Sequence, residues 1–228
     1  VAQGLFRNPL ADPYLLGSAS GASLGVATVL ALMGGGAGMV GGASAAMAVS
    51  VYSSHWLVRL GLTGAAFAGA VLAVLLTLAL ARGVQHTLRL LLAGVIVGVV
   101  LGALRDLVEL ASPDILPSMQ SFTLGTTSFV GWMACALMAG AWGVCSLLAW
   151  VLARALDGLT LGEATAASLG LPLAPMRVGL VAALALATGT AVAQTGLIAF
   201  VGLAAPHLVR SIVRVTHERH IVLSSLMG

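Results

Sequence analysis

The chain alternates between long apolar stretches and short polar ones. No Asp, Glu, Lys or Arg occurs between Arg59 and Arg82, or between Arg177 and Arg210. Each gap holds about 20 apolar residues, roughly the length that a helix needs to cross the hydrocarbon core of a membrane. The stretches are apolar on all sides and lack the period-two alternation of barrel strands, so the pattern favours helices packed in lipid.

The alternation predicts about six membrane spans. They are expected at Leu15–Met33, Leu57–Ala81, Leu88–Leu110, Val130–Ala153, Val178–Ala193 and Gly196–Val213, the last one shorter and interrupted by Pro206. The glycine run at 34–42 and the proline-containing segment at 112–117 mark turns, because both disfavour a helix interior. The predicted fold class is an all-α polytopic membrane helical bundle, with residues 1–228 forming one domain of a longer protein.

Composition supports a membrane protein. Of the 228 residues, 60% are hydrophobic and only 7% are charged, which leaves too little polar surface to cover a soluble globule. The 29 glycines suit helices that pack closely in lipid. Cys135 and Cys145 both lie in one apolar stretch, so a disulfide framework is not indicated.

The basic residues are all arginines, and they are distributed unevenly over the two ends of the spans. Following the alternation, one face collects Arg7, Arg82, Arg89, Arg154, Arg177, Arg210, Arg214 and Arg219. The opposite face receives only Arg59 and Arg105. The positive-inside tendency therefore places the first face in the cytoplasm. The lack of lysine also excludes a Walker-type phosphate loop, so this chain is not the subunit that hydrolyses a nucleotide.

Two polar connections have distinctive local chemistry. In the segment Arg7–Gly17, two prolines four residues apart fix a rigid bend, and Asn8 and Asp12 can bond to nearby backbone. In the segment 156–172, Thr160 and Glu163 match a capping box, and a glycine and a proline end the short helix that follows. A short amphipathic helix of this kind lies on the membrane surface or docks into the groove of a partner.

Four segments carry a resemblance to a known family. They read RNPLADPYLLG (7–17), RLLLAGV (89–95), LTLGEATAASLGLP (159–172) and FVGLAAPHLVR (200–210). In this order they resemble the FecCD-type permeases, the membrane subunits of ABC importers for iron chelates, haem and vitamin B12. The resemblance implies a ten-helix type II permease that works as a homodimer. On that mapping the chain lacks the first helix, nearly all of the second and most of the last two.

The resemblance also implies two functional regions. The cytoplasmic gate of the family falls on Asn8, Leu10, His86, Thr87 and Leu88; Leu88 departs from the hydroxylic residues found in the family at this loop. The coupling helix that docks on the ATPase subunit falls at about residues 157–172, and the residues expected to serve it are Thr160, Leu161, Gly162, Glu163, Ala166, Leu169 and Gly170.

The implied partners are an ABC ATPase, a periplasmic or lipid-anchored substrate-binding protein, a second permease copy and membrane lipid, with no nucleic acid. This chain would bind no cofactor itself, because ATP and Mg belong to the ATPase. The implied location is the bacterial inner membrane. The residues that meet the binding protein lie in the family's second and ninth helices and are not assigned here.

Several other residues have a functional and a structural interpretation. His55, Arg105, Asp106 and Glu109 are candidates for an outer vestibule, while Arg105 and Glu109 also have the i,i+4 spacing of a simple helix-end ion pair. His207 is interpreted as structural, His217 and His220 as part of a solvated loop, and Met133, Met138 and the two cysteines as core packing. No spacing matches a zinc or iron site.

The predicted function is ATP-driven import of an iron chelate, either a siderophore or haem, with cobalamin as the next substrate. An ion-coupled secondary transporter is a different class, and it would need ionisable groups at mid-membrane, whereas these charges sit at span ends. A membrane scaffold without transport is a third class.

Overall fold

The computed structural model describes residues 1–34, 56–81, 87–127, 130–160, 163–168, 170, 172–213 and 215–228. Within these residues every regular element is helical. The elements are α1 (Ala2–Leu5), η1 (Pro13–Leu16), α2 (Ser18–Gly34), α4 (Trp56–Leu80), α5 (Thr87–Ala111), η2 (Pro113–Ile115), α6 (Leu116–Leu124), α7 (Trp132–Val151), α8 (Ala153–Thr160), α9 (Glu163–Ser168), α10 (Leu173–Thr195), α11 (Val201–Ile212) and α12 (His217–Met227).

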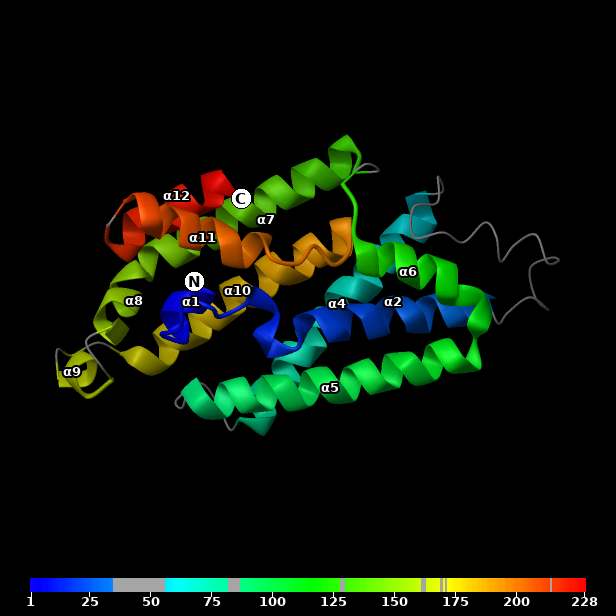
Figure 1. Ribbon diagram of the computed structural model, residues 1–228, viewed down its shortest axis with the longest axis horizontal. Coiled ribbons are helices and arrows are strands. Elements are labelled where there is room, and N and C mark those ends of the chain that lie inside the picture. The colour runs from blue at the N-terminus through cyan, green and yellow to red at the C-terminus, as the bar shows by residue number, and fades with distance from the viewer. Residues whose placement is uncertain are drawn as a thin grey trace.

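The long helices form an elongated bundle (Figure 1). Four of them, α4, α5, α7 and α10, are long and apolar enough to cross a membrane, and α2 is a shorter apolar helix. The 25 residues of α5 extend about 37 Å at the helical rise, which exceeds the roughly 30 Å hydrocarbon core. The all-α membrane bundle predicted from the sequence is therefore confirmed, and α2, α4, α5 and α7 match the first four predicted spans within about three residues.

The last two predicted spans differ from the structure. Helix α10 begins at Leu173, five residues before the predicted start, because Leu173 and Met176 pack against the core. Helix α11 begins only at Val201, since Gly196 and Phe200 both adopt positive φ and break the backbone before it. Its 12 residues extend about 18 Å, too short to span alone. Pro206 does not interrupt it.

Two connections between spans contain more helix than the sequence predicted. In the polar connection before α10, α9 lies within the short helix expected at about residues 157–172, while α8 begins earlier, at Ala153, because Leu156 and Leu159, three residues apart, are fully buried on one side of α8. The connection after α5 contains η2 and α6, and α6 buries Met119 and Phe122. The turn predicted at the glycine run from 35 to 42 lies outside the described residues.

Helices α2 and α4 pack with their backbones in close contact. A Cβ atom on Gly21 or Gly25 of α2 would collide with the carbonyl of Gly69 or Ala65 on α4. Small residues at such a crossing let two helices approach closely, which is a common way to stabilise helix pairs in lipid. This contact belongs to a core of buried residues shared by α2, α4, α6 and the end of α10.

A second core lies at the other end of the bundle and combines α1, α8 and the first half of α10. Helix α10 is the central span: half of the residues in its most apolar stretch are buried, compared with 17% in α5 and in α7. The outer faces of α5 and α7 carry exposed large side chains such as Val99 and Leu147. Their exposure suits an environment of lipid rather than water.

Candidate functional site

The segment Arg7–Gly17 forms the rigid bend that its prolines predict. The Asn8 side-chain oxygen accepts the Leu10 N–H at 2.9 Å, and the Asp12 carboxylate accepts the Tyr14 N–H at 2.7 Å to cap η1. Gly17 ends η1 with φ of 77°, the left-handed conformation that favours glycine. The Leu10 side chain is 66% exposed at the outside of this bend.

The bend packs directly on the start of α5. Ala11 and Leu16 share a buried cluster with Leu90 and Ala93 of α5. The structure thus places the bend beside the start of α5, the helix that follows the second loop to which the resemblance assigns a gate. Leu88, at the start of α5, is 72% exposed, whereas His86 and the side chain of Thr87 lie outside the described residues.

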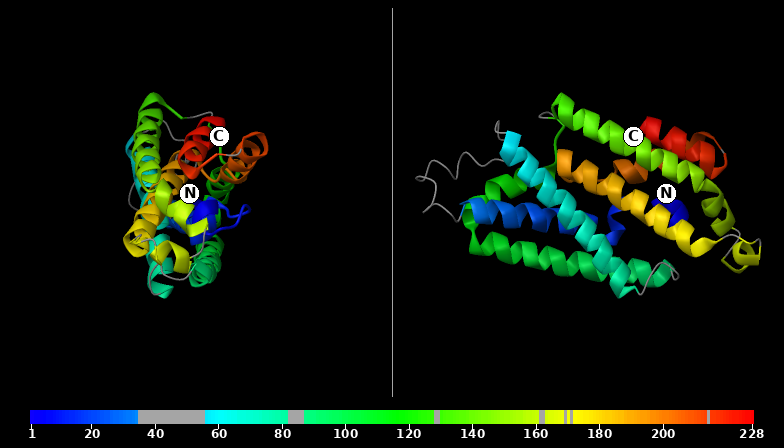
Figure 2. Two further views of the ribbon diagram at one scale, coloured as in Figure 1. Left: turned by 90° about the vertical axis from the view of Figure 1, so that its left-hand side faces the viewer. Right: turned by 180° about the vertical axis from the view of Figure 1, so that it is seen from behind.

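The segment expected to couple to an ATPase lies at one extremity of the bundle, as both long views show (Figures 1 and 2). Thr160 is the last residue of α8 and α9 begins at Glu163. The side chains of both residues lie outside the described part of the chain, so the capping box stays a prediction. Ala166 is fully buried, and Gly170 adopts φ of 76° just after α9. Leu161, Gly162 and Leu169 lie outside the described residues.

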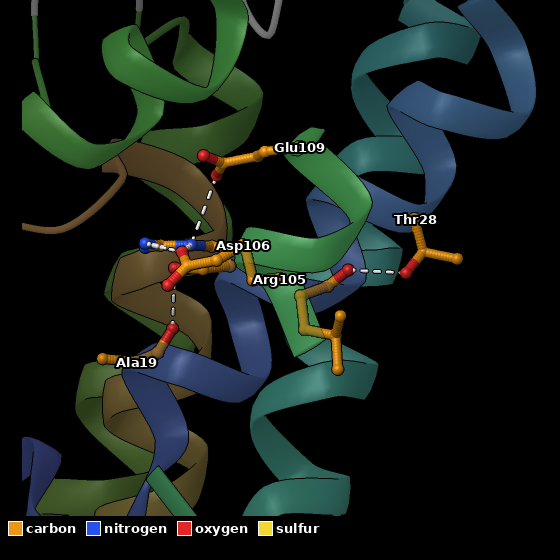
Figure 3. A network of polar contacts seen from close by, with 7 residues as sticks. Ala19, Thr28, Arg105, Asp106 and Glu109 are labelled. Carbon is orange, nitrogen blue, oxygen red and sulfur yellow. Dashed lines mark hydrogen bonds and ion pairs between the residues drawn. The ribbon is translucent and has the colours of Figure 1, made fainter. Parts of the chain in front are cut away.

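The three charged candidates on α5 lie at the opposite end of this helix from the bend, and their side chains point toward one another (Figure 3). The Arg105 guanidinium bonds Asp106 at 2.6 Å and Glu109 at 3.2 Å. One guanidinium against two carboxylates leaves the cluster with a formal charge of −1. The helix-end ion pair is thus present in the structure, and a vestibule role stays a prediction. His55 lies outside the described residues.

A set of polar contacts that the sequence did not predict joins four helices beside the bend. Asp157 of α8 accepts the His217 backbone N–H at 3.3 Å and lies 2.6 Å from His217 Nδ1. Arg210 of α11 donates from Nε to His220 Nε2 at 3.1 Å and from Nη2 to the Gln3 side-chain oxygen of α1. We call Gln3, Asp157, Arg210, His217 and His220 the inter-helix polar chain.

The protonation state of His220 follows from its partners. An arginine can only donate, so Nε2 of His220 must be the unprotonated nitrogen and Nδ1 carries the hydrogen. Nδ1 lies 2.9 Å from the Ser224 hydroxyl, which can accept it. Burial, together with the positive charge of Arg210, lowers the pKa of His220 below its usual 6.5, which agrees with a neutral ring.

The structure differs from the sequence-based interpretation of two groups of residues, the histidines of α12 and the sulfur-containing residues of α7. His217 and His220 are half-buried and bonded to other helices rather than solvated, and only the fold could bring together residues as far apart as Gln3 and Arg210. On α7, Met133 and Cys135 are exposed and Met138 is half-buried, while Cys145 is buried as predicted. The helical period of an all-apolar span does not show which of its sides faces protein, so these positions could not be distinguished from the sequence.

The chain is similar in sequence to several ABC transporter permeases. The chain is 34% identical over 226 residues to the uncharacterized ABC transporter permease protein YvrB of Bacillus subtilis, covering 99% of this chain and 60% of that protein. It is 35% identical over 233 residues to the cobalamin import system permease protein BtuC of Halobacterium salinarum, covering 100% of this chain and 56% of that protein. It is 36% identical over 213 residues to the vitamin B12 import system permease protein BtuC of Escherichia coli O157:H7, covering 92% and 58%.

A solved structure of an ABC transporter assigned to the metal-chelate type, in an inward-facing conformation, has the same fold. It superposes with a TM-score of 0.79 at 26% identity, over 99% of this chain and 67% of that one. The chain spans 56–60% of the length of the three curated relatives named above. The FecCD transport family matches residues 1–228 without a break. The chain therefore belongs to the FecCD transport family.

Proposed function

We propose that the chain forms part of the permease subunit of a binding-protein-dependent ABC importer. The match of all 228 residues to the FecCD transport family carries this proposal. The packed apolar helices and the fold shared with a metal-chelate type transporter support it. The sequence has no lysine for a phosphate loop, so the energy would come from ATP and Mg bound by a separate ATPase.

In this proposal the two ends of the bundle have different tasks. The bend at Asn8 and Leu10, together with His86, Thr87 and Leu88, closes the cytoplasmic exit of a pathway between two permease copies. The segment from Thr160 to Gly170 docks on the ATPase, and its place at an extremity of the bundle suits that contact (Figure 2). An extracytoplasmic binding protein delivers the substrate at the other end, near Arg105, Asp106 and Glu109.

Transport requires that the helices of this chain adopt two conformations of similar free energy. Binding of the partners would change the relative populations of the two conformations. A ligand or partner shifts such an equilibrium only by its difference in affinity for the two states. ATP binding would supply that difference at the ATPase, and the docked segment would pass it to the gate. A membrane of the bacterial inner type, with the arginine-rich face in the cytoplasm, gives the required orientation.

The proposed substrate is a metal held in an organic chelate. An iron chelate, a siderophore or haem, is the first candidate, and the fold shared with a metal-chelate type transporter supports it. Cobalamin is the second candidate, because two relatives at 35% and 36% identity are named as cobalamin or vitamin B12 import permeases. Both are large, rigid chelates that a narrow ion pathway could not carry.

Uptake by vesicles tests the proposal. The full-length permease, reconstituted with its ATPase and binding protein, should accumulate a radiolabelled ferric siderophore, haem or cobalamin only when ATP is inside the compartment that holds the ATPase. A labelled cobalamin and a labelled ferric chelate, offered separately, distinguish the two candidates. Uptake driven by an imposed proton or sodium gradient without ATP would instead indicate a secondary transporter.

Substitutions in α9 test the docking segment. Ala166→Pro should abolish ATP-driven uptake, because a proline in the middle of this short helix lacks a backbone N–H and its ring clashes with the preceding turn, at a position that is fully buried. Glu163→Lys should do the same by reversing a charge. Thr165→Ala, at an exposed neighbouring position, is the control and should transport normally. Normal uptake by both Ala166→Pro and Glu163→Lys, with normal membrane insertion, would remove the docking role.

A further inference from the structure

The inter-helix polar chain continues into the bend that holds Asn8 and Leu10. The backbone carbonyl of Gln3 accepts the Asn8 N–H at 3.1 Å, and the Asn8 side chain in turn accepts the Leu10 N–H at 2.9 Å. Two sets of hydrogen bonds, joined by one turn of α12 between His217 and His220, therefore lead from α8 through α12, α11 and α1 to Leu10.

Two cavities border most of this series of bonds. A cavity of about 430 Å³ and a second one of about 1170 Å³ are both lined by Gln3, Gly4, Arg210, His217 and His220, whereas Asp157 lies beside the buried cluster that contains Leu156. Hydrogen bonds to charged groups are stronger than those between neutral groups. The bond from Arg210 therefore helps to hold α11 to α1, and the contact between Asp157 and His217 helps to hold α12 to α8.

Helix α1 is also held directly against α8. Leu156 and Leu159 of α8 pack in one buried cluster with Leu5 and Phe6. Gly4 faces both Leu156 and His217, and a Cβ added there would lie 3.1 Å from each side chain. A displacement of α8 would therefore displace α1 by two routes. One is the direct packing of Leu156 and Leu159, and the other is the contact of Asp157 with His217, which packs against Gly4.

We propose that the inter-helix polar chain transmits the movement of α8 and α9 to the bend at Asn8 and Leu10. This inference rests on the proposed function, in which α9 docks on an ATPase and the bend closes the exit. Asp157, His217, His220, Arg210 and Gln3 are positioning residues: they contact neither substrate nor nucleotide, and they couple two sites by joining the elements that carry them.

A cysteine reporter at Leu10 measures this coupling without a transported substrate. The full-length permease, assembled with its ATPase in nanodiscs, carries Leu10→Cys in a background of Cys135→Ser and Cys145→Ala. The rate of modification by a maleimide is measured without nucleotide and with ATP trapped by vanadate. We expect trapping to change the rate in this parent complex, because the bend moves with the ATPase.

Removing one link should uncouple the reporter while the complex stays intact. His217→Ala should reduce the nucleotide-dependent rate change by about fivefold or more, with ATP hydrolysis and copurification retained. Asp157→Ala, at the edge of the segment assigned to docking, should reduce the rate change by a similar factor. The double variant should be no worse than either single one, because both remove the same contact. Glu218→Ala, exposed in the same turn of α12, is the matched control and should respond like the parent.

The outcomes separate this inference from the proposed function. A full response in Asp157→Ala, or an equal loss in Glu218→Ala, would overturn the polar chain and leave the importer intact. A parent complex that neither responds to nucleotide nor takes up chelate with ATP would overturn the proposed function itself. If Asp157→Ala does not assemble, Gln3→Leu at the other end of the chain gives the same test, with the same loss expected.

Discussion

His220 is a residue of the polar chain whose surroundings oppose the uptake of a proton. Burial and the Arg210 guanidinium lower its pKa, and His217 lies on the same side of α12, with Asp157 beyond it. The unfolded chain would take up a proton near the usual pKa of 6.5, while the folded chain resists it. Stability contributed by the neutral ring is therefore complete above pH 6.5 and is lost as the pH falls below it.

His220→Gln should make the protein less sensitive to acid. Glutamine is neutral at every pH and can accept from Arg210, so the loss of thermal stability between pH 7.5 and pH 5.5 should be smaller than in the parent. His207→Gln, at an exposed position on α11, is the control and should follow the parent. Melting curves in detergent at several pH values provide the measurement, and equal slopes in all three proteins would contradict the account.

At this scale, sequence spacing predicts only local contacts. Arg105 and Glu109 lie one helical turn apart, and their ion pair could be expected from the i,i+4 rule. Asp157 and His217 are 60 positions apart, and Gln3 and Arg210 are 207 apart. No periodicity joins such residues, so the polar chain could only be seen once the helices were packed.

At the scale of helices, the contact between α2 and α4 depends on glycine in a way that can be measured. Gly69 of α4 has the Gly21 carbonyl where a side chain would begin, whereas Gly64, on the same helix, has open space there. The two positions share a helix and an apolar setting. They differ in whether a neighbouring backbone excludes a methyl group.

Gly69→Ala should destabilise the protein and Gly64→Ala should not. Forcing a methyl group into the α2–α4 contact should cost about 1–3 kcal/mol. At Gly64 the same change should be neutral or should gain about 0.5–1 kcal/mol, because alanine favours a helix. Unfolding in mixed SDS micelles, followed by circular dichroism, compares the two; a loss of similar size in both would show that helix packing is not the cause.

Helix positions were more predictable than helix ends. The centres of the first four spans follow from their apolar length alone, because a membrane requires that length. The end of α10 and the start of α11 depend on the positive φ of Gly196 and Phe200, and a phenylalanine gives no sequence signal for that conformation. The helical turns of α8 depend on burial against α1 and α10, which appears only in the folded bundle.

At the scale of the molecule, the two ends of α5 define opposite faces. The acidic cluster ends this helix near α6, and α9 lies at the far extremity of the bundle (Figure 1). The excess of arginines expected on the α9 side assigns that side to the cytoplasm under the positive-inside tendency. The direction of transport in the proposed function depends on this orientation.

Labelling from one side of the membrane tests the orientation. In a background without native cysteines, Leu110→Cys at the exposed end of α5 should react with an impermeant maleimide in intact spheroplasts. Thr165→Cys in α9 should react only after permeabilisation. Leu180→Cys, fully buried in α10, is the control and should stay unlabelled in both conditions. The reverse pattern would invert the topology and remove the docking role of α9.

The interlocked glycines of α2 and α4 also restrict where the bundle can bend. Two helices whose backbones touch cannot slide past each other without a steric clash, so this pair must pivot as one piece, together with α6 and the end of α10 that share its core. The contacts that α11 makes with α1 and α12 makes with α8 include hydrogen bonds between side chains, which can lengthen or exchange without such a clash. Any change in the shape of this bundle is therefore expected to carry α2 and α4 as a unit and to be taken up at these side-chain contacts.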